Sequence, residues 1–184
     1  FIKYAVDGAN RMKQLIIDLL NYSKINRQLP DVEVDLNTVV KDVLENLKTI
    51  IVESKTEIKI DELPVILADK TQMIQVFQNL LANAVKFQVK DNIPEIRISA
   101  ERKTDEWLFS VKDNGIGIDK KYHDKVFVIF KQLHSKAMFN GTGIGLAVVK
   151  KIVERHGGTI WFESELGKGT TFYFTLKVKK HESS

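Results

Sequence analysis

The chain has 184 residues, a formal net charge of +4 and 43% hydrophobic residues. These values are typical of one globular domain with an appendage, and the charge is too small to indicate a nucleic-acid partner. No apolar run approaches the length needed to span a bilayer. The absence of cysteine excludes disulfides and thiolate metal sites. The composition suits a cytoplasmic domain, whose parent protein is either soluble or membrane-anchored.

Residues 1–28 have the pattern of one long amphipathic helix that ends before Pro30. Its narrow stripe alternates steps of three and four, as a helix-bundle seam does. The stripe consists of Ile2, Ala5, Ala9, Met12, Ile16, Leu19 and Ser23. A lone helix of this length needs a partner, which is either its own domain or a second copy of the chain. Because the sequence opens in mid-pattern and without Met, we expect a fragment of a longer protein.

The remainder of the chain has the alternation of strands and helices typical of an α/β domain. Strands are expected at 32–35, 57–60, 65–68, 95–102, 107–111, 159–164 and 169–177, and helices at 37–53, at 70–87 and from 142 or 143 to 156. A turn near 62–64 joins two of the strands. We expect a mixed sheet of about five strands with three helices on one face.

Residues 116–141 show little periodicity of either kind. A loop of this length is usually functional or disordered. Phe127 and Phe130 stand three residues apart within it. They either anchor the loop to the domain as a lid or belong to the core of a short helix.

The helix expected at 70–87 carries a polar face. Asn79, Asn83 and Lys86 stand at i, i+4 and i+7, so their side chains project from one side of the helix. Amides are costly to bury without a partner, so this face needs a polar ligand. A nucleoside triphosphate with Mg²⁺ meets that need, because Mg²⁺ prefers oxygen ligands. For this stretch alone, a solvated helix edge is an equally good alternative.

Three glycine motifs follow the polar helix. They span 113–118 (DNGIGI), 141–146 (GTGIGL) and 167–172 (GKGTTF). The chain has neither the G-x-x-x-x-G-K-[ST] phosphate loop nor the G-x-G-x-x-G fingerprint, so the two commonest phosphate-binding loops are excluded. One glycine cluster is weak evidence, but the ordered series favours a nucleotide site over a set of ordinary turns.

This series resembles the N, first glycine, phenylalanine, second glycine and third glycine boxes of two-component sensor histidine kinases. These kinases belong to a wider ATPase superfamily with gyrase, the heat-shock chaperone ATPases and MutL. The resemblance extends from the first residues to about Lys177, and the run from Phe127 to Phe174 resembles kinases of phytochrome type in particular. It implies a Bergerat-type two-layer α/β sandwich preceded by a long dimerisation helix.

The resemblance also implies a division into domains. Residues 11–23 match the family pattern of the second helix in a dimerisation and phosphoacceptor hairpin. We therefore expect this helix at 1–29, the catalytic ATP-binding domain at 31–178 and a tail at 179–184. A second copy of the chain would pair with residues 1–28 to form a homodimer.

Each motif has an expected role in binding ATP and Mg²⁺. Asn83 would bind the metal, with Asn79 near it or acting through water, and Lys86 would neutralise a phosphate. The carboxylate of Asp113 can accept a hydrogen bond from the exocyclic amine of adenine, although an Asp-Asn-Gly turn is the alternative. Expected ATP-binding residues are Asn83, Lys86, Phe87, Asp113, Gly115, Gly117, Ile118, Phe130, Gly141, Thr142, Gly143, Gly145, Leu146 and Thr171, and the expected catalytic residues are Asn79, Asn83 and Lys86.

We therefore expect the catalytic domain of a sensor histidine kinase, which transfers the γ-phosphoryl group of ATP to a histidine on the first hairpin helix, for relay to a response-regulator receiver domain. Of the histidines, none has the phosphoacceptor context, so no autophosphorylation is expected at the usual site; they are His123, His134, His156 and His181. Asn79 cannot take up a proton, so ATP hydrolysis should be slow. The alternatives are an anti-sigma-type protein serine kinase and a degenerate, non-catalytic nucleotide-binding module.

Overall fold

The computed structural model describes residues 6, 8, 9, 12, 13, 15–17, 19, 20, 22, 32–90, 92–130 and 142–178. The predicted tail at 179–184 and Gly141 of the second glycine motif lie outside these residues. The described positions between 6 and 22 are helical. The elements that follow are β1 (Val32–Asp35), α2 (Leu36–Asn46), α3 (Lys48–Ser54), β2 (Glu57–Ile60), β3 (Val65–Ala68), α4 (Lys70–Lys86), β4 (Glu95–Arg102), β5 (Glu106–Asp113), the 3₁₀ helix η1 (Lys120–Lys125), α5 (Gly145–Arg155), β6 (Ile160–Glu165) and β7 (Gly169–Lys177).

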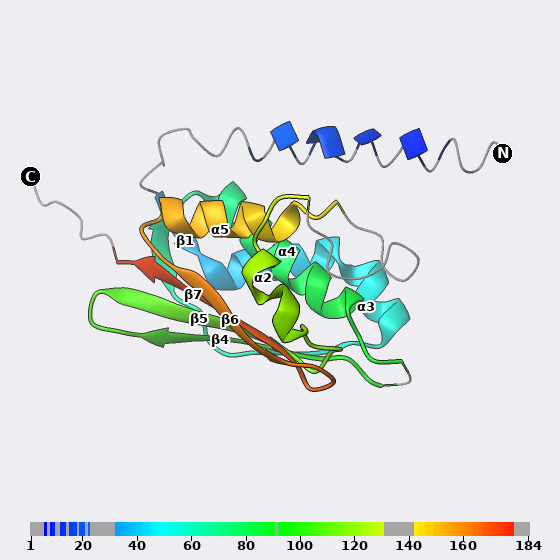
Figure 1. Cartoon of the computed structure of the whole chain (residues 1–184). Helices are drawn as coiled ribbons and strands as arrows, with labels where there is room; N and C mark the ends of the chain where they lie inside the picture. Colours follow the sequence, from blue (N-terminus) through cyan, green and yellow to red (C-terminus); the bar gives the residue numbers. More distant parts are fainter. Residues whose placement is uncertain are drawn as a thin grey trace, which may run out of the picture.

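The main sheet has five strands in the order β2-β4-β5-β7-β6. β2 runs parallel to β4 and the other neighbours are antiparallel, so the sheet is mixed, as predicted. The helices of the domain cover one face of this sheet (Figure 1). β1 and β3 form a separate antiparallel pair. The predicted α/β sandwich is therefore confirmed.

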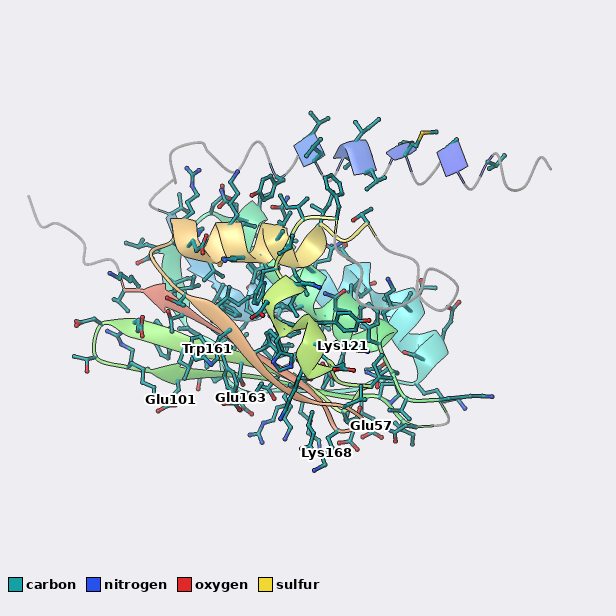
Figure 2. All side chains as sticks on the ribbon, viewed as in Figure 1. Glu57, Glu101, Lys121, Trp161, Glu163 and Lys168 are labelled. Atoms are coloured by element: carbon teal, nitrogen blue, oxygen red, sulfur yellow. The ribbon has the colours of Figure 1, made fainter. Side chains whose placement is uncertain are left out.

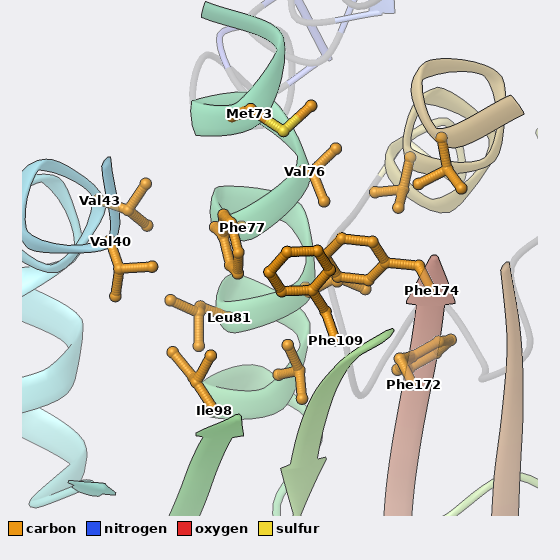
Figure 3. Close-up of a cluster of buried hydrophobic side chains, with 14 of the residues drawn as sticks. Val40, Val43, Met73, Val76, Phe77, Leu81, Ile98, Phe109, Phe172 and Phe174 are labelled. Carbon is orange, nitrogen blue, oxygen red and sulfur yellow. The ribbon is translucent and has the colours of Figure 1, made fainter. Parts of the chain in front are cut away.

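An aromatic cluster joins the helix layer to the sheet (Figure 3). Phe77 of α4 packs edge-on against Phe109 of β5 and Phe174 of β7, with ring centroids 6.4 and 5.9 Å apart. Phe109 and Phe174 stack at 4.8 Å, and all three side chains are fully buried. Burying one such side chain contributes about 1.5–3 kcal/mol. The cluster fixes α4, which carries the polar face, against the strands that adjoin the first and third glycine motifs.

α4 begins at a side-chain cap. The carboxylate of Asp69 accepts hydrogen bonds from the N–H groups of Thr71 and Gln72 at 2.8 and 3.1 Å. Two of the free amides at the start of the helix are thereby satisfied. The buried apolar side of the helix consists of Met73, Val76, Phe77, Leu80, Leu81, Ala84 and Val85. Asn79 and Asn83 fall between these positions and face another side.

One local expectation was wrong. The helix predicted at 37–53 is interrupted at Leu47, where α2 ends and α3 begins. Leu47 has φ −97° and ψ 3°, yet its N–H donates to Val43 and its carbonyl accepts from Ile51, so the chain bends there without a loop. The strands on either side of the turn at 62–64 belong to different sheets, because β2 pairs with β4 and β3 pairs with β1.

The N-terminal helical positions contact α5. Lys151 donates a hydrogen bond from Nζ to the carbonyl oxygen of Tyr22 at 2.9 Å, and its ammonium lies 4.1 Å from the centroid of the Tyr22 ring. Leu15 and Tyr22 are half-buried against the core, whereas Met12 and Ile16 are exposed. One side of this segment therefore packs on the domain, and residues of the predicted seam remain on its surface. No helix in the described ranges is long and apolar enough to cross a lipid bilayer.

The sheet face away from the helices carries an aromatic pair. Trp161 of β6 stacks on Tyr173 of β7 with ring centroids 5.5 Å apart. Figure 2 shows Trp161 and Glu163 on the side of the sheet opposite the helices. Trp107 of β5 lies beneath the guanidinium of Arg102, 5.5 Å from the ring centroid. Trp161 therefore lies on the face away from the helices, whereas Trp107 shares the face of Phe109 and Val111 and packs against the core.

Candidate functional site

Asp113, the last residue of β5, holds its carboxylate between the first and third glycine motifs. Its Oδ1 accepts hydrogen bonds from the N–H groups of Gly115 at 2.8 Å and Thr170 at 3.1 Å. Within the described residues, no hydrogen bond reaches Oδ2. Burial raises the pKa of Asp113 to about 6, although the two amide bonds oppose this shift. A half-buried carboxylate with one unused oxygen is suited to accept a hydrogen bond from a ligand.

Glycine is required where the first and third motifs touch. Gly117 has φ +70°, and a Cβ there would overlap the carbonyl oxygen of Glu165. The N–H of Gly167 donates to the carbonyl of Ile116 at 2.8 Å. Two loops that are about 50 residues apart in the sequence are therefore joined through their backbones. Each of these two motifs also supplies one N–H group, that of Gly115 or of Thr170, to the Asp113 carboxylate.

The side chain of Asn79 on α4 contacts the start of α5. Its Nδ2 donates to the carbonyl of Gln75 at 2.8 Å. Its Oδ1 faces Gly145, where a Cβ would lie only 2.5 Å from it. Gly145 thus admits the Asn79 side chain, and the second glycine motif meets the polar helix at this pair.

Asn83 and Lys86 lie half-buried further along the same face of α4. The side chain of Asn83 makes no hydrogen bond with any described residue. Burial lowers the pKa of Lys86, and its Nζ lies 4.9 Å from the centroid of the Phe87 ring. An amide oxygen and a partly desolvated ammonium on one face suit the phosphates of a nucleotide.

The donors on this face fit Mg²⁺ better than a softer metal. Among the described residues, no group of three or more His, Cys, Asp or Glu side chains could hold a metal ion. Mg²⁺ prefers oxygen ligands, keeps several waters and takes further oxygens from substrate phosphates, so a single protein amide can suffice. Asn83 fits this role best, because the oxygen of Asn79 faces Gly145.

The described part of the segment at 116–141 contains η1 and two phenylalanines, of which one packs through its ring and the other is attached through its backbone. Phe127 packs edge-on against Phe162 and Phe172, with centroids 6.0 and 6.4 Å away. Phe130 is 58% exposed and has φ +64°, and its N–H donates to the carbonyl of Gly143 at 2.9 Å. The ring of Phe127 therefore anchors the segment, whereas Phe130 is attached through its backbone to the second glycine motif.

Thr170, and not the predicted Thr171, lies at Asp113. Thr170 is buried and donates its N–H to the carboxylate. Thr171 pairs with Lys112 and Glu163. Because successive side chains of a strand face opposite sides, the side chain of Thr171 lies on the sheet face away from the helices. The structure therefore places Thr170, one residue before the predicted Thr171, beside the Asp113 carboxylate.

Most of the remaining predicted residues gather around the start of α5 and the loop after β5. Ile118 is buried, and Thr142, Gly143 and Leu146 are half-buried. Thr170 and Ser164, which bind the loops around Asp113, were not predicted as site residues. The available signal for Thr170 was the alternation of β7, whose helix-facing residues are Thr170, Phe172, Phe174 and Leu176.

Comparison with known proteins agrees with this geometry. Residues 68–180 match the family described as histidine kinase-, DNA gyrase B-, and HSP90-like ATPase. The chain is 49% identical to cyanobacterial phytochrome A of Nostoc sp. (strain PCC 7120) over 183 residues, which cover 99% of this chain and 24% of that protein. The chain spans about a quarter of the length of the curated relatives that it matches most strongly.

Two solved structures share the fold. Full-length ShkA in complex with AMPPNP superposes with a TM-score of 0.77 and 26% identity, over 92% of this chain and 36% of that one. Histidine kinase ThkA in complex with the response regulator protein TrrA superposes with a TM-score of 0.75 and 26% identity, over 97% of this chain and 50% of that one.

The two-layer fold, the carboxylate at the end of β5 and the polar face of α4 define a nucleotide-binding ATPase domain. The chain belongs to the histidine kinase-, DNA gyrase B- and HSP90-like ATPase family. Within that family, it is the ATP-binding catalytic domain of a sensor histidine kinase, as its ordered motifs predicted.

Proposed function

We propose that this domain transfers the γ-phosphoryl group of ATP to a histidine on the other helix of a dimerisation hairpin. Residues 1–29 are the second helix of that hairpin, 31–178 the catalytic domain and 179–184 a tail. The similarity to a phytochrome over 99% of the chain supports this division, as do the helical positions between 6 and 22. Exposed Met12 and Ile16 on that segment suit contact with a second copy of the chain.

The half-buried carboxylate of Asp113 is the observation that carries the proposal. Its Oδ1 is held by two backbone amides, which leaves Oδ2 for the exocyclic amine of adenine. Guanine presents a carbonyl at the corresponding position, so two acceptors would face each other. Asp113 therefore selects ATP over GTP.

The phosphates bind between the polar face of α4 and the start of α5. Asn83 would hold Mg²⁺, which would neutralise phosphate charge. Lys86 adds a positive charge that partial burial makes more effective. Free backbone amides at the start of α5 favour the same anion.

The domain positions ATP, and the nucleophile comes from the hairpin. An imidazole nitrogen attacks the γ-phosphorus, a P–N bond forms, and the P–O bond to the leaving ADP breaks. Asn79 donates its Nδ2 to Gln75 and has no basic group, so it does not activate water. Bound ATP is therefore hydrolysed slowly and remains available for transfer to the histidine. The domain acts in the cytoplasm, where ATP is supplied.

Calorimetric titration with AMP-PNP and Mg²⁺ tests the assignment of Asp113. We expect Asp113→Asn to weaken binding by about 100-fold, because a hydrogen bond to a charged group is lost and an amide donor replaces an acceptor. Asp105→Asn is the matched control, since Asp105 is exposed at the far end of the β4–β5 hairpin. Near-normal affinity of the Asp113 variant with an intact circular-dichroism spectrum would refute the assignment.

Phosphoryl transfer separates the kinase from its alternatives. The domain is mixed with radiolabelled ATP and a hairpin fragment that supplies the phosphoacceptor histidine. Acid-labile label on the fragment is expected, whereas acid-stable label would indicate a serine kinase and absence of label a non-catalytic module. The solved complex of ThkA with a response regulator supports a receiver domain as the next acceptor.

A further inference from the structure

The hydroxyl of Ser164 connects the two loops that enclose Asp113. The N–H of Ile118 donates to Ser164 Oγ at 2.8 Å, and Ser164 Oγ donates to the carbonyl of Gly169 at 3.0 Å. The hydroxyl oxygen of Thr170 lies 2.8 Å from Ser164 Oγ. A hydroxyl donates once and accepts twice. All three contacts are satisfied when Thr170 donates to Ser164.

The carbonyl that Ser164 binds and the amide that binds Asp113 belong to one peptide group. The carbonyl of Gly169 and the N–H of Thr170 are held in one plane by the peptide bond. That N–H donates to Asp113 Oδ1 at 3.1 Å. A donor at the carbonyl end polarises the group and strengthens its N–H as a donor at the other end. Ser164 therefore sets both the orientation and the strength of this bond.

We infer that Ser164 is a positioning residue for the nucleotide base, acting on Asp113 through the 169–170 peptide. The hydrogen bonds run from Ile118 through Ser164 and the peptide to the carboxylate, so the first and third glycine motifs move as one unit. Ser164 itself does not bind the base. The inference rests on the proposed recognition of adenine by Asp113.

One titratable side chain borders this chain of hydrogen bonds: Nε2 of His123 in η1 lies 3.3 Å from the carbonyl oxygen of Ile118, and the His123 ring packs edge-on against Phe162. Two charged side chains on the neighbouring strands face away from it. Lys112 of β5 and Glu163 of β6 are exposed on the sheet face away from the helices. The causes that act on the Asp113 pKa are burial, which raises it, and the amide bonds from Gly115 and Thr170, which lower it. Weakening the bond from Thr170 therefore raises the Asp113 pKa further.

Nucleotide binding across pH 5–8 tests the inference with three variants. We expect Ser164→Ala to bind Mg·ADP about tenfold more weakly and to move the pH midpoint of binding upward, because one hydrogen bond is lost from each loop. Ser164→Thr keeps a hydroxyl and should restore both values. Ser110→Ala is the matched control, because among the described residues the Ser110 hydroxyl hydrogen-bonds only to that of Ser99, at 2.6 Å, on the opposite face of the sheet.

A ligand-free measurement separates this inference from the proposed function. Carbon-13 NMR titration of the Asp113 carboxyl without nucleotide should give a higher pKa in Ser164→Ala than in the wild type. Equal pKa and equal affinity would overturn the inference. Failure of the wild type to bind nucleotide would instead refute the proposed function. If the alanine variant does not fold, Ser164→Cys, with a weaker donor, must shift the Asp113 pKa in the same direction.

Discussion

The Asp113 side chain opposes folding at neutral pH, because burial disfavours its charged form. Burial raises the pKa of Asp113 from its ordinary value of 3.8 to about 6 in the folded protein. Between these values, the folded state binds more protons than the unfolded state, so stability falls as pH rises through this window. Above pH 6, the full cost of about 3 kcal/mol is present, and below pH 4 it vanishes.

Asp113→Asn should therefore be more stable than the wild type at pH 7 but not at pH 4. The asparagine oxygen can accept the same two amide bonds without carrying a charge. Urea unfolding at several pH values measures the difference in unfolding free energy between the two proteins. A difference that stays constant from pH 4 to pH 7 would contradict the assigned pKa.

Gly145→Ala should be destabilising because its Cβ would lie 2.5 Å from the oxygen of Asn79. Asn79 must then leave its present position and lose the bond to Gln75. In Gly145→Ala/Asn79→Ala, the clash is gone, so a double-mutant cycle in urea should give a coupling energy of about 1 kcal/mol or more. Additive free energies would show that the two residues do not depend on each other.

At the site, residue types and helical spacing could be predicted from the sequence, but the exact residue beside Asp113 could not. Asp113 could be proposed because it opens a glycine motif directly after an apolar strand. The face with Asn79, Asn83 and Lys86 could be proposed because these residues are spaced at i, i+4 and i+7 of a helix. The sequence did not distinguish Thr170 from Thr171. Which of two neighbouring strand residues faces the site depends on the pairing across the sheet, and a shift of one residue changes the face. Ser164 gave no signal, because its partners at 118 and 169 are backbone groups of distant loops.

At the scale of the helix, the cap of α4 is a testable source of stability. Asp69→Ala removes the acceptor of two amide bonds and should lower the unfolding free energy by about 1 kcal/mol. Asp69→Asn keeps an acceptor and should lose little. Urea denaturation with an unchanged m-value measures both. Equal losses in the two variants would show that charge, and not capping, matters at this position.

Element boundaries were predictable where the apolar period is clear. The strands at 57–60, 65–68 and 95–102 have the predicted bounds, because alternation is local. The bend at Leu47 was not predictable, because no Gly or Pro stands at this position and the i to i−4 backbone hydrogen bonds run on through it. The pairing of β2 with β4 was not predictable from the turn at 62–64, because tertiary packing, not the turn, decides the partner.

At the scale of the whole molecule, Lys151 links the N-terminal helical segment to α5. Lys151→Met removes the hydrogen bond and the cation–π contact with Tyr22 but keeps the alkyl chain. We expect faster chymotryptic cleavage after Tyr22 in this variant, because the segment opens more often. Lys150→Met is the control, since Lys150 forms an ion pair with Glu154 on the same helix. Equal cleavage rates in both variants would exclude a role of Lys151.

The two tryptophans of the chain report on the sheet and not on the site. Trp161 stacks on Tyr173, and Trp107 lies beneath Arg102, so neither indole neighbours the Asp113 carboxylate or the polar face of α4. The intensity of tryptophan fluorescence should therefore change little when nucleotide binds, but it should change when the sheet unfolds. The same emission can consequently follow melting of the free and the saturated protein, and the shift between the two curves gives the affinity by mass action.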